Sequence, residues 1–97
     1  DMHTNAEAAR NLTYKSAWSV DNADGQLTKL ASMAKEFASR TAVENANECV
    51  QIHGGSGFVD DFDAERFYRD AKITQIYEGT TEIQKMIIAR ELQGKGL

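Results

Sequence analysis

Residues 76–82 read Ile-Tyr-Glu-Gly-Thr-Thr-Glu and place one carboxylate, that of Glu78, between an apolar segment and a turn typical of a helix start. A carboxylate just outside a helix N-terminus can be held still and partly shielded from water. Such a group can be tuned to take a proton, so Glu78 is a candidate general base. Taken alone, the same spacing is more often that of a solvated Glu ahead of a helix.

A second unusual stretch, residues 51–58, reads Gln-Ile-His-Gly-Gly-Ser-Gly-Phe. Glycines allow a backbone to approach a ligand closely, but they also end helices, and this plainer interpretation is favoured by the residues alone. The stretch is not a P-loop, since no Gly-Lys-Ser/Thr follows it. His53 by itself is more often a polar loop residue than a catalyst or ligand.

The elements that must position these residues belong to one small domain over residues 1–97. Apolar periodicity predicts helices over residues 5–20, 26–50, 64–71 and 80–93, and nothing alternates with period two. We therefore expect an all-α, up-and-down bundle of three long helices and one short helix. Asp24 and Thr80 are candidate N-caps, residues 54–57 end the second long helix, and Gly94 is a candidate stop for the last.

Several side chains are predicted to fill the core. Two seams on the first helix, one of them containing Tyr14 and Trp18, predict two helical neighbours. Phe37, the Met residues and Cys49 are also expected inside, and Ile83, Met86, Ile87 and Arg90 share one face of the last helix. Arg66, Arg69 and Asp70 are expected to form structural ion pairs.

Composition excludes several classes of function. The net charge of −4 and the absence of a basic run argue against nucleic acid. No apolar run approaches the ~20 residues that span a membrane, and no secretory leader is present. Cys49 is the single cysteine, which favours a reducing compartment, and no Cys/His cluster has metal-ligand spacing. The acidic run at residues 60–63 favours a solvated turn, with metal binding the lesser alternative.

Taken together, several motifs resemble the C-terminal region of acyl-CoA dehydrogenases. They are residues 51–58, Glu-Arg-Phe-Tyr-Arg-Asp-Ala-Lys-Ile at 65–73, Ile-Tyr-Glu-Gly-Thr at 76–80, Ile83-Gln84, and Ala-Arg-Glu at 89–91. Each motif alone is weak, but their order and spacing are specific. Glu-Ala-Ala-Arg at 7–10 and Leu-Thr-Tyr at 12–14 are similar to an earlier bundle helix of that family.

The resemblance implies an FAD-dependent enzyme of fatty acid metabolism that oxidises an acyl-CoA to a trans-2-enoyl-CoA and passes electrons to an electron-transfer flavoprotein. It implies that Glu78 is the base for the α-proton, with its N–H bonded to the thioester oxygen, and that Tyr77 and Gly79 lie at the substrate. Arg90 matches an Arg near the base. The implied FAD-binding residues are Gln51, Ile52, His53, Gly54 and Gly55, which reach the neighbouring subunit's flavin, and Thr80, Thr81 and Glu82.

Family members are several times longer, with a helical and a β domain ahead of a four-helix bundle, so the resemblance covers the last three bundle helices. It implies that the isolated chain is inactive, whether it is an excised domain, a truncated product or one subunit of a split enzyme. Some members carry the base on the first bundle helix, whereas Glu78 stands at the commoner position. The alternative function is a non-catalytic helical oligomerisation module. In either case we expect a homo-oligomer, in the cytoplasm or mitochondrial matrix.

Overall fold

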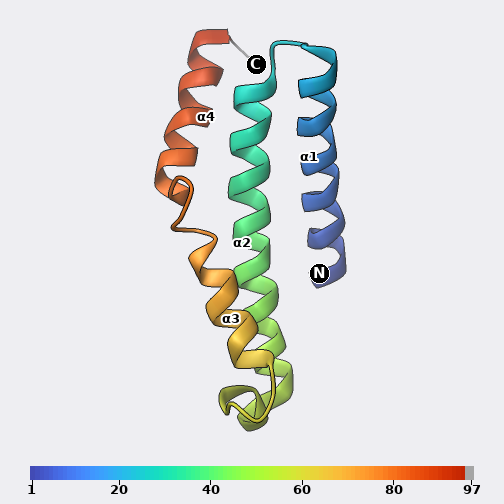
Figure 1. The fold of residues 1–97 in the computed structure, drawn as a ribbon, viewed down its shortest axis with the longest axis vertical. Coiled ribbons are helices and arrows are strands. Elements are labelled where there is room, and N and C mark those ends of the chain that lie inside the picture. The colour runs from blue at the N-terminus through green and yellow to red at the C-terminus, as the bar shows by residue number, and fades with distance from the viewer. Residues whose placement is uncertain (96–97) are drawn as a thin grey trace.

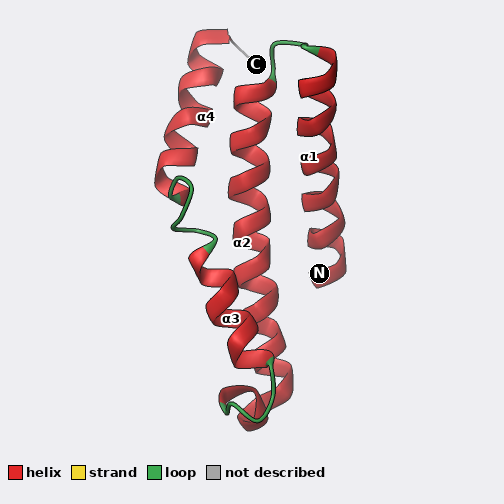
Figure 2. Ribbon diagram, in the orientation of Figure 1, coloured by secondary structure: helices red, strands yellow, loops and turns green. Residues whose placement is uncertain are grey.

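The computed structural model describes residues 1–95. Its elements are α1 (Met2–Asn22), α2 (Leu27–His53), a short 3-10 helix η1 (Gly54–Phe58), α3 (Ala64–Ile73) and α4 (Thr81–Lys95). Figure 2 shows helices joined by loops throughout this part of the chain, without a strand. The predicted all-α fold, with three long helices and one short one, is therefore confirmed.

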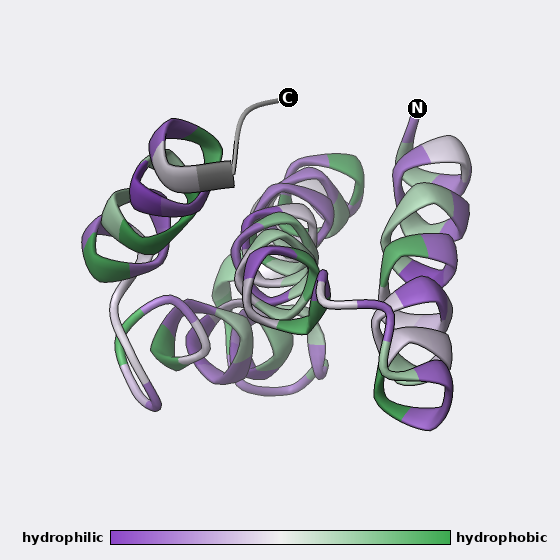
Figure 3. Ribbon diagram, turned by 90° about the horizontal axis from the view of Figure 1, so that it is seen from above, coloured by the Kyte–Doolittle hydropathy of each residue, from purple (hydrophilic) through white to green (hydrophobic). Residues whose placement is uncertain are grey.

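The longest helix, α2, lies at the centre of the molecule. Helix α1 runs along one side of it, while α3 and α4 follow each other along the other side (Figure 1). Seen down the helices, α1 and α4 lie on opposite sides of α2 (Figure 3), and among the described elements α1 contacts α2 alone. Helix α2 runs antiparallel to α1, and α3 and α4 both run back along α2 in the opposite direction to it, as in an up-and-down bundle, but the helices form an open layer (Figure 1).

Small and polar residues let the other helices approach α2 closely. Its buried positions are Leu30, Ser32, Ala34, Glu36, Ser39, Thr41 and Ala46. Glu36 is compensated by Arg40, whose Nε lies 3.0 Å from the Glu36 carboxylate. The apolar core is consequently thin, because the buried hydrophobic residues among the described ones are Leu30, Ala34, Ala46 and Ala64. Assembly with other surfaces would therefore add much to stability.

The helix ends bear out some of the predicted boundaries. Helix α2 ends at His53, and Gly54 follows with a φ of 62°, in the left-handed region that glycine adopts readily. The hydroxyl of Thr80 accepts a hydrogen bond from the N–H of Ile83 at 3.3 Å, as an N-cap does. Thr80 therefore caps α4 as predicted.

Two other predicted boundaries are wrong. Asp24 does not cap α2, because its carboxylate accepts hydrogen bonds from the Ser19 hydroxyl and the Gln26 N–H, and the helix begins only at Leu27. Gly94 does not stop α4, which runs on to Lys95. A glycine stop uses the left-handed conformation, and Gly94 is not among the residues with positive φ.

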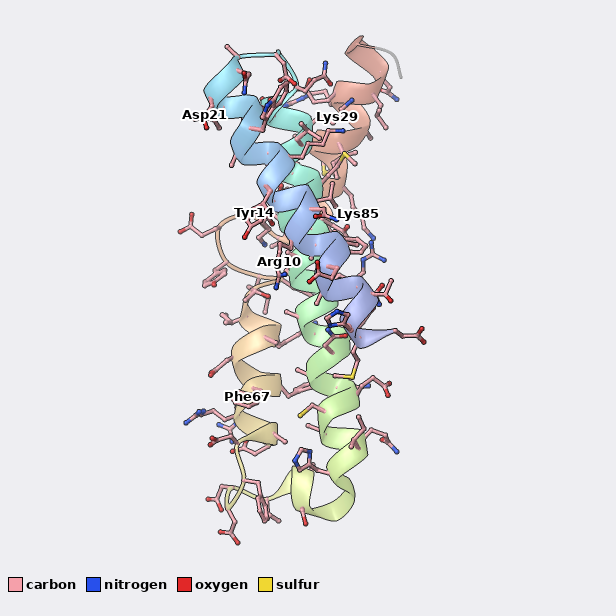
Figure 4. The ribbon with its side chains drawn as sticks, turned by 90° about the vertical axis from the view of Figure 1, so that its right-hand side faces the viewer. Arg10, Tyr14, Asp21, Lys29, Phe67 and Lys85 are labelled. Carbon is pink, nitrogen blue, oxygen red and sulfur yellow. The ribbon has the colours of Figure 1, made fainter. Side chains whose placement is uncertain are left out.

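The predicted core also needs correction. Tyr14 and Trp18 are 66 % and 54 % exposed, because the face of α1 that carries them has no neighbouring helix in the described chain. Figure 4 looks onto α1 and shows Arg10 and Tyr14 at its surface. Ile83, Met86 and Arg90 are exposed as well, and α4 instead buries Gln84. Phe37, Met2, Met33 and Cys49 are half-buried. None of the helices within residues 1–95 combines the length and apolarity needed to cross a membrane.

Candidate functional site

The segment between α3 and α4, residues 74–80, forms a compact turn. The N–H groups of Ile76 and Tyr77 both donate to the carbonyl oxygen of Ile73, at 2.9 and 3.1 Å. The Thr81 N–H donates back across the turn to the Gln75 carbonyl at 3.1 Å. These hydrogen bonds fold the chain back on itself directly before α4.

Glu78 occupies the strained part of this turn. Its φ is 57°, in the left-handed region that costs a non-glycine residue roughly 1–2 kcal/mol, and Gly79 follows with a φ of 97°. No acceptor within residues 1–95 takes the N–H of Glu78. The side chain is exposed, so the chain itself does not supply the shielding from water that the sequence predicts.

Lys35 of α2 connects the two ends of the turn. Its ammonium group donates to the carbonyl oxygens of Thr74 and Gly79, both at 2.7 Å. Lys35 is not among the functional residues predicted from the sequence. The sequence nevertheless contained a sign of it, because Lys35 is a charged residue on a face of α2 whose other residues, Ala38, Ser39 and Ala42, are small.

The start of α4 holds the turn from the other side. Gln84 is 8 % exposed, and a Cβ added to Gly79 would lie 2.5 Å from its Nε2 atom. The Gln84 N–H donates to the Thr80 carbonyl at 2.9 Å. The positive φ of residue 79 favours glycine, and a larger side chain would also have to displace the Gln84 amide.

Thr80, Thr81 and Glu82 line one small hollow of about 190 Å³, together with Lys72, Gln75 and Ile76. Hydroxyl groups and a helix N-terminus suit polar cofactor atoms. Three of the residues predicted to bind FAD are thus brought together, next to the candidate base. The hydroxyl, amide and ammonium groups of this hollow are donors of the kind that polar atoms of a dinucleotide accept.

Tyr77 lines a different hollow, of about 260 Å³, against α2. Its other lining residues are Lys35, Ala38, Ser39, Ala42 and Thr74. The Tyr77 ring and the two alanines make this wall largely apolar, which suits an acyl chain.

The remaining predicted FAD-binding residues, 51–55, lie at the far end of α2. Lys35 and Gln51 are sixteen positions apart on one helix, which is roughly 24 Å at 1.5 Å per residue. All five residues are exposed. The fold therefore does not bring them to the hollow beside Thr80, and it leaves them exposed. Their contact with another subunit's flavin stays a prediction.

Arg90 follows Thr81 by nine positions on α4, roughly 14 Å along the helix, and its side chain is exposed. An arginine near the base therefore stays a prediction. The predicted ion pairs of Arg66 and Arg69 are confirmed, to Asp63 at 3.6 Å and Glu65 at 3.2 Å.

The arrangement around η1 was not predicted. A hollow of about 400 Å³ lies between α2, η1 and α3, lined by Asn47, Val50, Gly57, Phe58, Glu65, Tyr68 and Arg69. A Cβ at Gly57 would come 2.5 Å from the carbonyl oxygen of Val50. Gly57 is therefore the glycine of this segment that packing requires, and it is the buried one.

Comparisons with known proteins agree on one family. The family described as acyl-CoA dehydrogenase, C-terminal domain, matches residues 1–93. An acyl-CoA dehydrogenase of Bacillus subtilis is 54 % identical over 94 residues, which is 97 % of this chain and 24 % of that protein. The chain thus spans about a quarter of the length of the curated relatives it matches.

Solved structures give the same result. The butyryl-CoA dehydrogenase of Megasphaera elsdenii matches with a TM-score of 0.90 and 45 % identity, over 96 % of this chain and 24 % of that one. A chain from work on the electron transferring flavoprotein of Acidaminococcus fermentans matches with a TM-score of 0.90 and 46 % identity, over 95 % of this chain and 24 % of that one. At this identity the likeness extends to sequence as well as fold.

Proposed function

The chain belongs to the acyl-CoA dehydrogenase family, as its C-terminal helical domain, and we propose that it supplies the base for α,β-dehydrogenation of an acyl-CoA thioester. The observation that carries the proposal is the geometry of Glu78. Its carboxylate stands on a turn held by both α2 and α4, while its own N–H has no acceptor among residues 1–95. Glu78 thus carries both the proposed base, its carboxylate, and a hydrogen-bond donor, its backbone N–H.

In the proposed reaction the Glu78 carboxylate takes the α-proton of the thioester. The Glu78 N–H donates to the thioester oxygen, where negative charge develops as the proton leaves. Bound FAD would supply the hydride acceptor for the β-hydrogen. The product is a trans-2-enoyl-CoA. Since an α-proton is weakly acidic, the fixed placement of base and donor is the main contribution of this chain.

Glu78 is exposed in the chain, so other surfaces have to exclude water from it. The acyl group of the substrate, lying along the Tyr77 hollow, would cover one side. The Thr80–Thr81 hollow, with the helix N-terminus behind it, would hold polar atoms of FAD on another. Gly79 keeps the backbone between these two hollows free of a side chain.

Residues 51–55 would serve a second FAD. Their distance from the Thr80 hollow supports the interpretation that they contact the flavin of a neighbouring subunit. An electron-transfer flavoprotein as the electron acceptor is supported by the likeness to the Acidaminococcus fermentans chain. The flavin and most of the substrate pocket would be contributed by parts of the flavoprotein outside these residues. The isolated chain is therefore expected to be colourless and inactive.

The test is Glu78→Gln in the complete flavoprotein that carries this chain, assayed with an artificial electron acceptor. Removing a general base is expected to lower kcat roughly 10²- to 10⁴-fold, with flavin content unchanged. Glu44→Gln, on the exposed surface of α2, is the matched control and should keep wild-type activity. A Glu78→Gln protein that dehydrogenates at the wild-type rate would falsify the proposal.

A second candidate function is helical assembly without catalysis. It is favoured by the exposure of Tyr14 and Trp18 on a helix that contacts α2 alone. Covering this face with a second copy of the chain would bury apolar surface. Light scattering at micromolar concentration measures this directly, and a monomer would count against it.

A further inference from the structure

Lys35 makes the one side-chain connection between the middle of α2 and the Glu78 turn that the described hydrogen bonds contain. The two carbonyl groups it reaches belong to residues 39 and 44 positions away in sequence. Both distances, 2.7 Å, are in the range of charge-assisted hydrogen bonds, which are stronger than neutral ones. A single ammonium group thus fixes the first residue of the turn and the residue directly after Glu78.

The two Lys35 hydrogen bonds lie on either side of Glu78 in the turn. Glu78 is in the left-handed conformation, and the Gly79 carbonyl belongs to the second peptide unit after it, between Gly79 and Thr80. A hydrogen bond to that carbonyl anchors the chain one residue beyond Glu78, which limits how far the Glu78 N–H and carboxylate can move. The bond to the Thr74 carbonyl holds the opposite end, so the turn cannot shift as a unit.

The Lys35 side chain is half-buried, and its aliphatic stem lines the same hollow as Tyr77. A lysine is suited to this position because its ammonium is a compact donor on a flexible stem. An arginine would present a planar fork, so its nitrogen atoms would reach the two carbonyl groups in a different geometry. Methionine would keep the apolar stem and remove both donations.

We propose that Lys35 is a positioning residue for the Glu78 base, a role that rests on the proposed function and deepens it. Lys35 acts through the backbone of Thr74 and Gly79, the two residues to whose carbonyl groups its ammonium donates. Removing the Lys35 ammonium leaves the Glu78 carboxylate present but no longer held in its reactive orientation. Because displacement of a catalytic group by about 1 Å can cost roughly 10²-fold in rate, the effect falls on the chemical step.

The experiment compares Lys35→Met, Lys35→Arg and Lys29→Met in the complete flavoprotein. Lys29 lies on the same helix and serves as the matched control. For Lys35→Met we expect a fall of roughly 10²-fold in kcat with KM nearly unchanged, and a larger isotope effect with α-deuterated substrate. Lys35→Arg should recover part of the rate, and Lys29→Met should match the wild type.

A double variant separates positioning from general stability. If Lys35 acts through Glu78, adding Lys35→Met to Glu78→Gln should lower the residual rate no further. An equal fall in both backgrounds, or a Lys35→Met protein with wild-type kcat, would overturn the proposal while leaving Glu78 as the base. If Lys35→Met does not fold, Lys35→Arg decides: a reduced kcat at unchanged KM supports the proposal, and a wild-type kcat overturns it. Wild-type activity of Glu78→Gln alone would instead sink the proposed function itself.

Discussion

Two turns of this molecule have similar backbones but different supports. In the turn between α1 and α2, Ala23 has a φ of 48° and Gly25 a φ of 80°. In the turn between α3 and α4, Glu78 and Gly79 have φ values of 57° and 97°. The first is closed locally, by Ser19 and Gln26 on the Asp24 carboxylate. The second is closed by Lys35, from the middle of another helix.

The comparison shows where backbone strain serves a purpose. Ala23 caps α1 with its N–H on the Ser19 carbonyl, a role that glycine fills with less strain. Glu78 accepts similar strain in a turn that two other helices fix, and it carries the proposed base. We infer that the carboxylate, rather than the fold, requires a non-glycine residue at position 78.

The largest expected difference between the turns is in activity. Glu78→Gly and Ala23→Gly relieve the same kind of strain, but Glu78→Gly is expected to lower kcat of the complete flavoprotein roughly 10²- to 10⁴-fold. Ala23→Gly should leave kcat unchanged. Steady-state assays with an artificial acceptor measure both, and equal activities would remove the distinction between the two turns.

The next effect is on stability at the two glycines. Gly79→Ala should lower the free energy of unfolding by about 1–2 kcal/mol, because it adds left-handed strain and displaces the amide of the buried Gln84 side chain. Gly25→Ala adds only the strain, since nothing lies within 4 Å of its added Cβ, and should cost about 1 kcal/mol.

Urea unfolding followed by circular dichroism measures these two values. Adding Gln84→Ala to Gly79→Ala removes the clash and should recover part of its excess cost. Equal losses in the free energy of unfolding for Gly79→Ala and Gly25→Ala would mean that Gln84 of α4 does not restrict the Glu78 turn.

A smaller gain is expected at the end of α1. Ala23→Gly should raise the free energy of unfolding by about 0.5–1 kcal/mol, because glycine adopts the left-handed conformation without a Cβ clash. Ala17→Gly, at an exposed position inside the same helix, should instead lower it by about 0.5–1 kcal/mol. Thermal unfolding of the two variants checks the opposite signs, and a loss at both positions would show that Ala23 is not strained.

The smallest effect concerns acid. The Ser19 hydroxyl, and next the Gln26 N–H, hold the pKa of Asp24 below its ordinary value of 3.8. Since the folded-state pKa is the lower one, the stabilisation is present above pH 3.8 and is lost as the pH falls through the folded pKa. Asp24→Asn should therefore be less stable than the wild type at pH 6, and the gap should close below pH 3.8. A gap that does not vary with pH would contradict the local closure of this turn.

Local signals in the sequence predicted much of the fold. The 3.6-residue periodicity gave four helices near their observed positions, and Thr80 and Gly54 marked two of their ends. The errors at Asp24 and Gly94 share one cause. An aspartate can cap a helix or close a turn, and a glycine can end a helix or lie within one. Neighbouring residues, such as Ser19 beside Asp24, decide between these roles.

The core was harder to predict, because periodicity shows that a helix has an apolar face without showing what covers it. Tyr14 and Trp18 form such a face and are exposed, while the buried residue of α4 is the polar Gln84. Burial depends on which elements become neighbours. In this chain, α1 and α4 each pack against α2 and not against one another.

The sequence by itself determined the helices, the family resemblance and the identity of Glu78 as the candidate base. These depend on residues close together in the chain or on their order along it. Only the tertiary structure brought Lys35 to the two ends of the Glu78 turn and Gln84 against Gly79, and left Gln51 roughly 24 Å along α2 from Lys35. Such contacts join distant segments, and their geometry exists only once α3 and α4 have packed along α2.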